Sequence, residues 1–167
     1  MNYRVFLGVG SNMGVREKYL QSAVQELGAL KETRIVWTSS IYECEPYGNP
    51  DQPSFLNAVV EMETTLAPSA LHTESRAIEQ RLGRTMSERW GPREIDIDIL
   101  IYDGLVVDEA SLKVPHPEIE KRKFVLVPLR EVAPDLVHPV SGLTMEELAR
   151  TCRDPLRVVK SSHRIKL

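Results

Sequence analysis

Cysteine is scarce in this chain of 167 residues, which contains only Cys44 and Cys152. The two lie far apart, and neither belongs to a Cys-x-x-Cys pair, so the sequence lacks the usual pattern of a structural zinc site or a disulfide framework. A reducing cytoplasm is therefore the setting that we expect. The net charge of −3 gives no basic excess, so we expect no nucleic-acid partner.

Long apolar runs are also missing. No stretch is long enough to span a bilayer, and residues 1–7 lead into a strand pattern without the apolar core of a signal peptide, so we expect a cytoplasmic protein with no membrane partner. The hydrophobic content of 42% and the charged content of 27% are ordinary for a globular protein. Since no linker interrupts the chain, we expect a single domain over residues 1–167.

The common nucleotide-binding motifs are absent as well. No Gly-Lys-Ser or Gly-Lys-Thr occurs, which excludes a P-loop. Gly8 and Gly10 begin a dinucleotide-like pattern, but Met13 stands where its third glycine belongs. We therefore interpret Gly8 and Gly10 as a tight strand-to-helix turn. ATP, if it binds, must use another architecture.

Hydrophobic periodicity predicts two strand-helix-strand units in succession. Strands are expected at 3–9, 34–42, 55–64 and 95–101, and helices before Gly28 and after Pro68, with Ser11 or Asn12 capping the first helix. The order βαββαβ indicates an α+β, ferredoxin-like sandwich, in which an antiparallel sheet carries helices on one face. A hairpin in 106–114, a helix over 125–132 and a capping box at 144–147 predict a C-terminal helical extension.

The segment 95–101 carries the strongest chemical signal. Alternation places four isoleucines on one face, at 95, 97, 99 and 101, and Asp96, Asp98 and Leu100 on the other. The two carboxylates would lie roughly 6–7 Å apart at the backbone, where like charges repel each other. A divalent cation such as Mg²⁺, which prefers carboxylate oxygens, would remove that repulsion. The alternative is a solvated strand edge.

Arginines precede this strand in a loop that contains glycine and proline. Arg84, Arg89 and Arg93 would carry guanidinium groups toward the carboxylates, and a metal with arginines is suited to binding polyphosphate. We expect this loop to be mobile in the free protein and to close over substrates.

Two further segments leave alternatives open. Phe55 and Asn57 share one face of a predicted strand and could hold a flat heterocycle, or they could be a core aromatic residue and a turn residue. His116 lies between two prolines, with Arg122 nearby, and could contact a phosphate group or form a structural turn.

Together these segments resemble the 6-hydroxymethyl-7,8-dihydropterin pyrophosphokinase family over nearly the whole chain. The family signature Trp-Gly-Pro-Arg-x-x-Asp-x-Asp is matched by residues 90–98. Further matches are Gly10-Ser11-Asn12, the run from Tyr42 to Asn57, Leu82-Gly83-Arg84, Val114-Pro115-His116 and Arg122-x-Phe124. The resemblance implies an Mg-dependent enzyme of folate biosynthesis, which transfers pyrophosphate from ATP, the co-substrate, to the hydroxymethyl group of the pterin and releases AMP.

The resemblance also implies residue roles. Asp96 and Asp98 would hold two Mg²⁺ ions and form the catalytic set with Arg84 and Arg93. The ATP-binding residues would be Glu79, Arg84, Trp90, Arg93, Ile99, His116 and Arg122. The pterin-binding residues would be Cys44, Glu45, Pro46, Tyr47, Phe55, Asn57 and Phe124. The partners are then two small-molecule substrates, ATP and the pterin, and we expect a monomer.

One departure concerns the arginine loop. Many family members carry Arg-x-Arg after the helix-ending glycine, whereas Met86 stands at the second position here and the loop is one residue shorter. Whether Arg89 replaces the second arginine is left open by the sequence.

Two other functions remain as alternatives. A regulatory module of the same fold would bind a small ligand without chemistry and without a metal requirement. A metal-dependent nucleotidyl transferase would release pyrophosphate in place of AMP.

Overall fold

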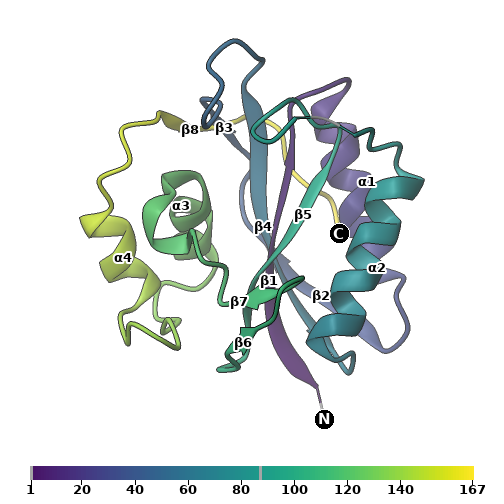
Figure 1. The fold of residues 1–167 in the computed structure, drawn as a ribbon, viewed down its shortest axis with the longest axis vertical. Helices are drawn as coiled ribbons and strands as arrows, with labels where there is room; N and C mark the ends of the chain where they lie inside the picture. The colour runs from purple at the N-terminus through teal and green to yellow at the C-terminus, as the bar shows by residue number, and fades with distance from the viewer. Residues whose placement is uncertain (1, 87) are drawn as a thin grey trace.

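The computed structural model describes residues 2–86 and 88–167, and its centre is an antiparallel sheet (Figure 1). The strands run in the order β5-β1-β4-β3-β8, and β2 also pairs with β4. Their bounds are β1 (Tyr3–Ser11), β2 (Thr33–Thr38), β3 (Tyr42–Cys44), β4 (Phe55–Thr64), β5 (Asp96–Tyr102) and β8 (Val158–Lys160). β2 and β3 pair with opposite halves of β4, so the single strand expected over 34–42 is interrupted in the structure.

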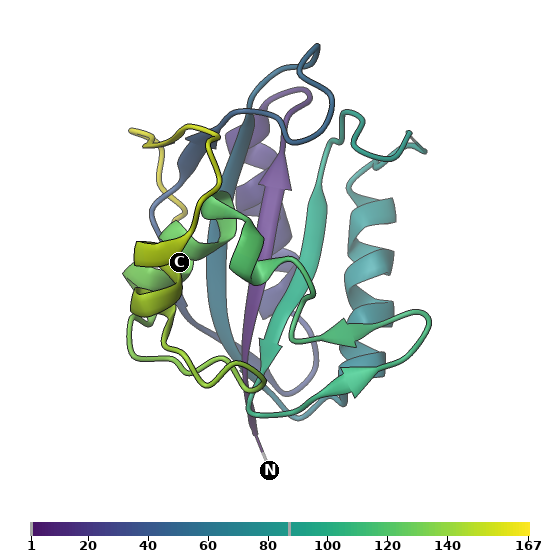
Figure 2. The same ribbon diagram turned by 60° about the vertical axis from the view of Figure 1, so that its left-hand side comes forward.

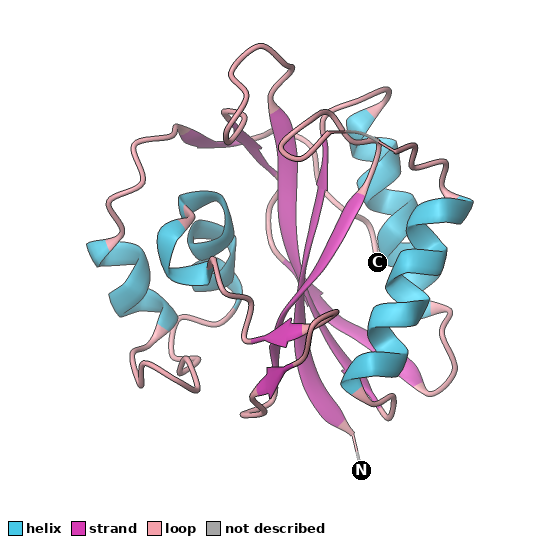
Figure 3. Ribbon diagram, in the orientation of Figure 1, coloured by secondary structure: helices cyan, strands magenta, loops and turns pink. Residues whose placement is uncertain are grey.

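Helices cover both faces of this sheet (Figures 1 and 3). α1 (Arg16–Gly28) and α2 (Pro68–Arg81) lie on one face, and α3 (Lys123–Val132) and α4 (Met145–Thr151) lie on the other. This confirms an α+β fold with helices packed on an antiparallel sheet. The two helices of the βαββαβ unit share one face, as predicted, and the C-terminal helical extension covers the other face, which Phe6 and Val59 make apolar.

The connections agree largely with the sequence. The hairpin of β6 (Val107–Asp108) and β7 (Lys113–Val114) lies beside the sheet (Figure 2), followed by the short helix η1 (Ile119–Lys121). The capping box of Thr144 and Glu147 at the start of α4 is confirmed. The predicted cap of α1 is wrong: the helix begins after Val15 with no side-chain cap, because Asn12 bonds to two distant loops.

No helix in the described part of the chain is both long and apolar enough to cross a membrane.

A β-bulge in β5 changes which side chains face which layer. Phe6 is opposite Ile101 but Leu7 is opposite Ile99, so Leu100 is an extra residue in the ladder. Ile99 therefore packs in the α1/α2 layer, whereas Leu100 and Ile101 both pack in the α3/α4 layer. The prediction that Ile101 shares the face of the other isoleucines is wrong for this reason.

Glu131 fastens α3 to the sheet. Its Oε2 accepts hydrogen bonds from the Ser40 N–H at 2.9 Å and from the Ser40 hydroxyl at 3.1 Å, and its Oε1 accepts one from the Tyr42 hydroxyl. Partial burial acts to raise the pKa of Glu131, but these hydrogen bonds outweigh it, so the pKa lies below its usual value.

We expect Glu131→Gln to lower the free energy of unfolding by about 1 kcal/mol at pH 7, because the charged acceptor is lost from a partly exposed site. The folded pKa of Glu131 is depressed, so the carboxylate stabilises the fold above its unfolded pKa and loses this effect as the pH falls through the folded value. Thermal melts should therefore show a difference between wild type and variant that shrinks below about pH 4.5. Glu63→Gln, which breaks the exposed pair with Arg34, is the control and should change Tm little. A difference that is constant down to about pH 3 would contradict this account.

Candidate functional site

A cavity opens over one end of the central strands, with β1, β4 and β5 as its floor. Gly10 is paired with Asn57, and a Cβ at Gly10 would lie 2.5 Å from Asn57 Oδ1. Gly8 and Gly10 both lie within β1, so their interpretation as a strand-to-helix turn is wrong. At Gly10 the missing side chain allows the Asn57 amide to lie against the strand.

Aromatic rings form the walls of this cavity. Phe55 and Asn57 come from the start of β4, Phe124 from the start of α3, and Tyr47 and Trp90 from two loops. Glu45 also lines the cavity. The cavity therefore brings together five of the seven predicted pterin residues: Glu45, Tyr47, Phe55, Asn57 and Phe124. Cys44 is 2% exposed in β3, and Pro46 lies in the loop that follows.

The guanidinium group of Arg122 lies among these rings. Its Cζ is 4.7 Å from the centre of the Tyr47 ring, 5.2 Å from that of Trp90 and 5.6 Å from that of Phe124. Arg89 stacks on Trp90 at 4.8 Å. A planar cation between aromatic rings indicates that the space accepts a flat, polar-edged group.

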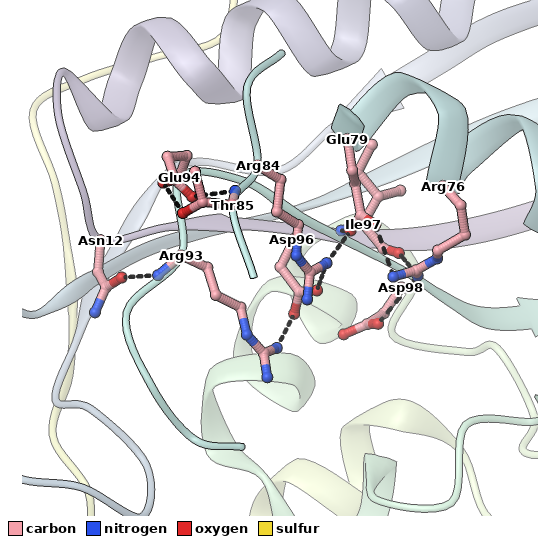
Figure 4. Close-up of polar contacts among 10 residues, drawn as sticks. All are labelled: Asn12, Arg76, Glu79, Arg84, Thr85, Arg93, Glu94, Asp96, Ile97 and Asp98. Atoms are coloured by element: carbon pink, nitrogen blue, oxygen red, sulfur yellow. Dashed lines mark hydrogen bonds and ion pairs between the residues drawn. The ribbon is translucent and has the colours of Figure 1, made fainter. Parts of the chain in front are cut away.

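Asp96 and Asp98 lie at the other end of the cavity, in contact with arginines (Figure 4). Arg84 donates to Asp96 Oδ1 at 3.0 Å, and Arg93 donates to Oδ2 at 3.1 Å. Arg76 lies 3.8 Å from Asp98 Oδ1. The structure thus brings together all four predicted catalytic residues.

The two aspartates have opposite pKa shifts. Burial and the neighbouring Asp96 raise the pKa of Asp98 above its usual range. Burial acts to raise the pKa of Asp96 too, but Arg93 and Arg84 outweigh it and lower the value. The charge on Asp98 is therefore the less well neutralised of the two.

Glu79 of α2 is buried under this arrangement, with its side chain 3% exposed. Its Oε2 accepts hydrogen bonds from Arg84 at 2.6 Å and from the Ile97 N–H at 2.8 Å, and its Oε1 pairs with Arg76 at 2.7 Å (Figure 4). Burial raises its pKa more than these partners lower it. Glu79 was predicted to bind ATP. Its buried position favours an indirect role in ATP binding, in which it orients Arg76 and Arg84.

Arg76 was missed by the sequence reasoning. A signal was present, because Arg76 stands three residues before Glu79 and so lies on the same side of α2. Gln52 was missed too: it donates to the Trp90 carbonyl at 2.7 Å, a contact between two loops that no local pattern predicts.

Asn12 holds the arginine loop at its base. The Arg93 N–H donates to Asn12 Oδ1 at 2.7 Å, and Asn12 Nδ2 donates to Gln52 Oε1 and the Pro53 carbonyl, both at 3.0 Å. Asn12 therefore links the arginine loop to the loop before β4, beside the cavity. Closure of the arginine loop on substrates stays a prediction.

Two of the predicted ATP-binding residues, Ile99 and His116, do not line the cavity. Ile99 is 4% exposed in the α1/α2 core. The His116 N–H donates to the Leu100 carbonyl at 2.9 Å, and its Nδ1 accepts from the Glu118 N–H at 3.1 Å, which makes a local turn. Burial and nearby Arg122 lower the pKa of His116. Contacts of both residues with ATP stay predictions.

We expect Glu79→Ala to lower the free energy of unfolding by about 3 kcal/mol, because it leaves the Ile97 N–H and two guanidinium groups without their buried acceptor. Urea denaturation followed by circular dichroism measures this. Glu26→Ala, which breaks the exposed pair with Arg81, should cost less than about 0.5 kcal/mol. Similar losses in the two variants would mean that the Glu79 network does not hold α2 to β5.

A family model described as 7,8-dihydro-6-hydroxymethylpterin-pyrophosphokinase (HPPK) matches residues 6–134. A 2-amino-4-hydroxy-6-hydroxymethyldihydropteridine pyrophosphokinase from Methylorubrum extorquens is 46% identical over 144 residues, which are 86% of this chain and 90% of that protein. The protein of the same name from Pseudomonas aeruginosa is 41% identical over 152 residues, 91% of this chain and 93% of its own.

A solved structure shares the fold. Wild-type Plasmodium falciparum HPPK-DHPS with pterin and p-hydroxybenzoate matches with a TM-score of 0.71 at 15% identity, over 90% of this chain and 42% of that one. This chain thus corresponds to less than half of that longer protein, and the likeness concerns the fold alone. From the family model and the sequence relatives, the chain belongs to the 7,8-dihydro-6-hydroxymethylpterin-pyrophosphokinase family.

Proposed function

We propose that this pyrophosphokinase transfers the pyrophosphoryl group of ATP to the hydroxymethyl group of 6-hydroxymethyl-7,8-dihydropterin, giving AMP and the pterin diphosphate in folate biosynthesis. One observation carries the assignment: a single cavity joins an aromatic compartment containing Asn57 to the arginine-bound pair of Asp96 and Asp98. A flat heterocycle and a polyphosphate would meet there.

The aromatic compartment suits the pterin. Phe55 and Phe124 offer ring faces for stacking, and the Asn57 amide offers both a donor and an acceptor for the edge of the heterocycle. Arg122 would have to leave the space between the rings, or stack on the ligand, when the pterin enters. Glu45, Tyr47 and the neighbouring Cys44 and Pro46 complete the proposed pterin set.

The carboxylate pair fits Mg²⁺. Asp96 and Asp98 stand on one side of β5, and the raised pKa of Asp98 reflects a negative charge that a cation would offset. Two ions are proposed, with remaining coordination positions taken by phosphate oxygens and water, as is usual for this metal. Mg²⁺ bound at Asp96 and Asp98 would neutralise the negative charge of the ATP phosphates.

The arginines would take over the charge that develops during transfer. Arg84 and Arg93 now bond to Asp96, and both would be free to turn to phosphate oxygens once the aspartate has another partner. Arg84 stays anchored to Glu79, so it would reach the phosphates from a fixed base. Arg89 stacks on Trp90, and this position favours Arg84 over Arg89 as the catalytic arginine.

Trp90 would cover the reacting groups. Its ring lies 4.9 Å from the ring of Tyr47, and its carbonyl is bonded by Gln52, so two loops meet over the cavity. Exclusion of water there would protect the pyrophosphoryl group from hydrolysis.

The organisation of the protein is proposed on the same basis. One sheet with an apolar layer on each face favours a single domain over residues 1–167. We further propose that it works as a monomer in the cytoplasm.

The deciding experiment is incubation with Mg²⁺, ATP and the pterin alcohol, with the products separated by chromatography. AMP with the pterin diphosphate supports the proposal. Release of pyrophosphate would indicate nucleotidyl transfer, and binding without turnover would indicate a regulatory module.

Asp98→Asn should reduce AMP formation by at least about 100-fold, because the carboxylate charge that would bind the metal is lost. The same change removes the repulsion with Asp96, so Tm in the absence of metal should be equal to or higher than that of wild type. Calorimetry should show weaker binding of Mg²⁺ with an ATP analogue. Near-normal turnover would remove Asp98 from the proposed metal site.

Gly10→Ala should weaken pterin binding by about tenfold, because the new methyl group displaces the Asn57 amide. A double-mutant cycle tests whether Gly10→Ala lowers pterin affinity by displacing Asn57. In an Asn57→Ala background, Gly10→Ala should have little further effect on pterin affinity. Additive losses would show that Gly10 acts independently of Asn57.

A further inference from the structure

The segment after α4 returns to the sheet, where β8 pairs with β3 (Figure 1). It comprises residues 154–160, ends in β8, and lies beyond residues 6–134, which the family model matches. We call it the C-terminal segment.

Its first contact is with the start of α3. Asp154 Oδ2 accepts a hydrogen bond from the Lys123 N–H at 3.0 Å, and its Oδ1 accepts one from the Leu156 N–H at 3.0 Å. Lys123 is the first residue of α3, whose N-cap residue Arg122 provides no side-chain cap. Asp154 therefore satisfies an N–H group at this helix end from outside the helix, and its negative charge suits that end.

This helix end carries three cavity residues, Arg122, Phe124 and Val125. Arg122 precedes Lys123 and Phe124 follows it, and both side chains line the cavity. The other end of α3 is fastened separately, by Glu131 to Ser40 and Tyr42. The hydrogen bond from Lys123 to Asp154 thus fixes the cavity end of the helix.

The second contact is with the opposite wall. β8 pairs with β3, with Val158 opposite Cys44. Directly before it, the Arg157 N–H donates to Glu45 Oε1 at 2.7 Å, and the Glu45 N–H donates to the Arg157 carbonyl at 3.1 Å. Glu45 lines the cavity, and Tyr47 follows two residues later.

We propose that the C-terminal segment fixes the two walls of the pterin subsite relative to each other, with Asp154 as its positioning residue. The segment is short and is bonded to the Phe124 wall at Asp154 and to the Glu45 wall at Arg157. Stacking on Phe124 depends on ring separation to within a fraction of an ångström, so a loosened helix start weakens pterin binding without touching the pterin. This inference rests on the proposed function, because it names the pterin as the ligand of the subsite.

The test uses the full chain with Asp154→Ala, and Thr144→Ala as the matched control. Both changes remove a side-chain acceptor from a helix N-terminus, but Thr144 caps α4, outside the cavity. Both should lower Tm by similar amounts. Calorimetry with the pterin and a non-hydrolysable ATP analogue should show a pterin Kd raised about tenfold in Asp154→Ala and unchanged in Thr144→Ala. The Kd of the ATP analogue should stay within about twofold in both.

Kinetics and a second variant separate positioning from general damage. The KM for the pterin should rise in Asp154→Ala, while kcat at saturating pterin stays close to that of wild type. Asp154→Asn keeps one carbonyl acceptor and should restore part of the affinity, which also keeps the test valid if Asp154→Ala folds poorly. Wild-type pterin affinity in both Asp154 variants, or an equal loss in Thr144→Ala, would overturn the inference. If wild type binds the pterin but forms no AMP, the proposed function fails while these binding measurements still decide the role of Asp154.

Discussion

The bond network around Glu79 is the constraint on which the rest of the site depends. It contains three carboxylates, Glu79, Asp96 and Asp98, and three guanidinium groups, those of Arg76, Arg84 and Arg93. Glu79 also accepts from the Ile97 N–H, which lies between the two aspartates in β5. One buried side chain therefore fixes the helix, the strand and two of the arginines together, and loss of Glu79 would leave the Ile97 N–H without its acceptor and the Arg76 and Arg84 guanidinium groups without their buried partner.

Much of the fold follows from local pattern. Phe55–Thr64 was predicted as a strand with the same bounds that β4 has, and the capping box before α4 needed only four residues to be recognised. The errors have non-local causes. The break between β2 and β3 and the position of Ile101 depend on pairing with β4 and β1, and sequence periodicity contains no information on a bulge set by a partner strand.

The same division holds for the candidate site. Asp96, Asp98 and Arg93 lie within one short segment, so their proximity could be predicted from spacing alone. Asn12 and Gln52 both lie in segments that match the family, but their bond spans 40 residues of chain, and only the folded arrangement reveals it. Gly10 is an intermediate case: its presence was noted, but the reason for it, the approach of Asn57, required the pairing of β1 with β4.

The bulge at Leu100 has a consequence for how this protein can vary. It separates β5 into an aspartate-bearing part and a part that ends at Tyr102, each with its own alternation of faces. Deletion of Leu100 would remove the bulge and leave Ile99 opposite Leu7 and Ile101 opposite Phe6, because Leu100 is the extra residue in the ladder. A deletion between Asp96 and Asp98 would move one carboxylate into the core. β5 can therefore lose a residue at its irregularity without moving an aspartate or a core side chain to the other face, whereas its aspartate-bearing part has a fixed length.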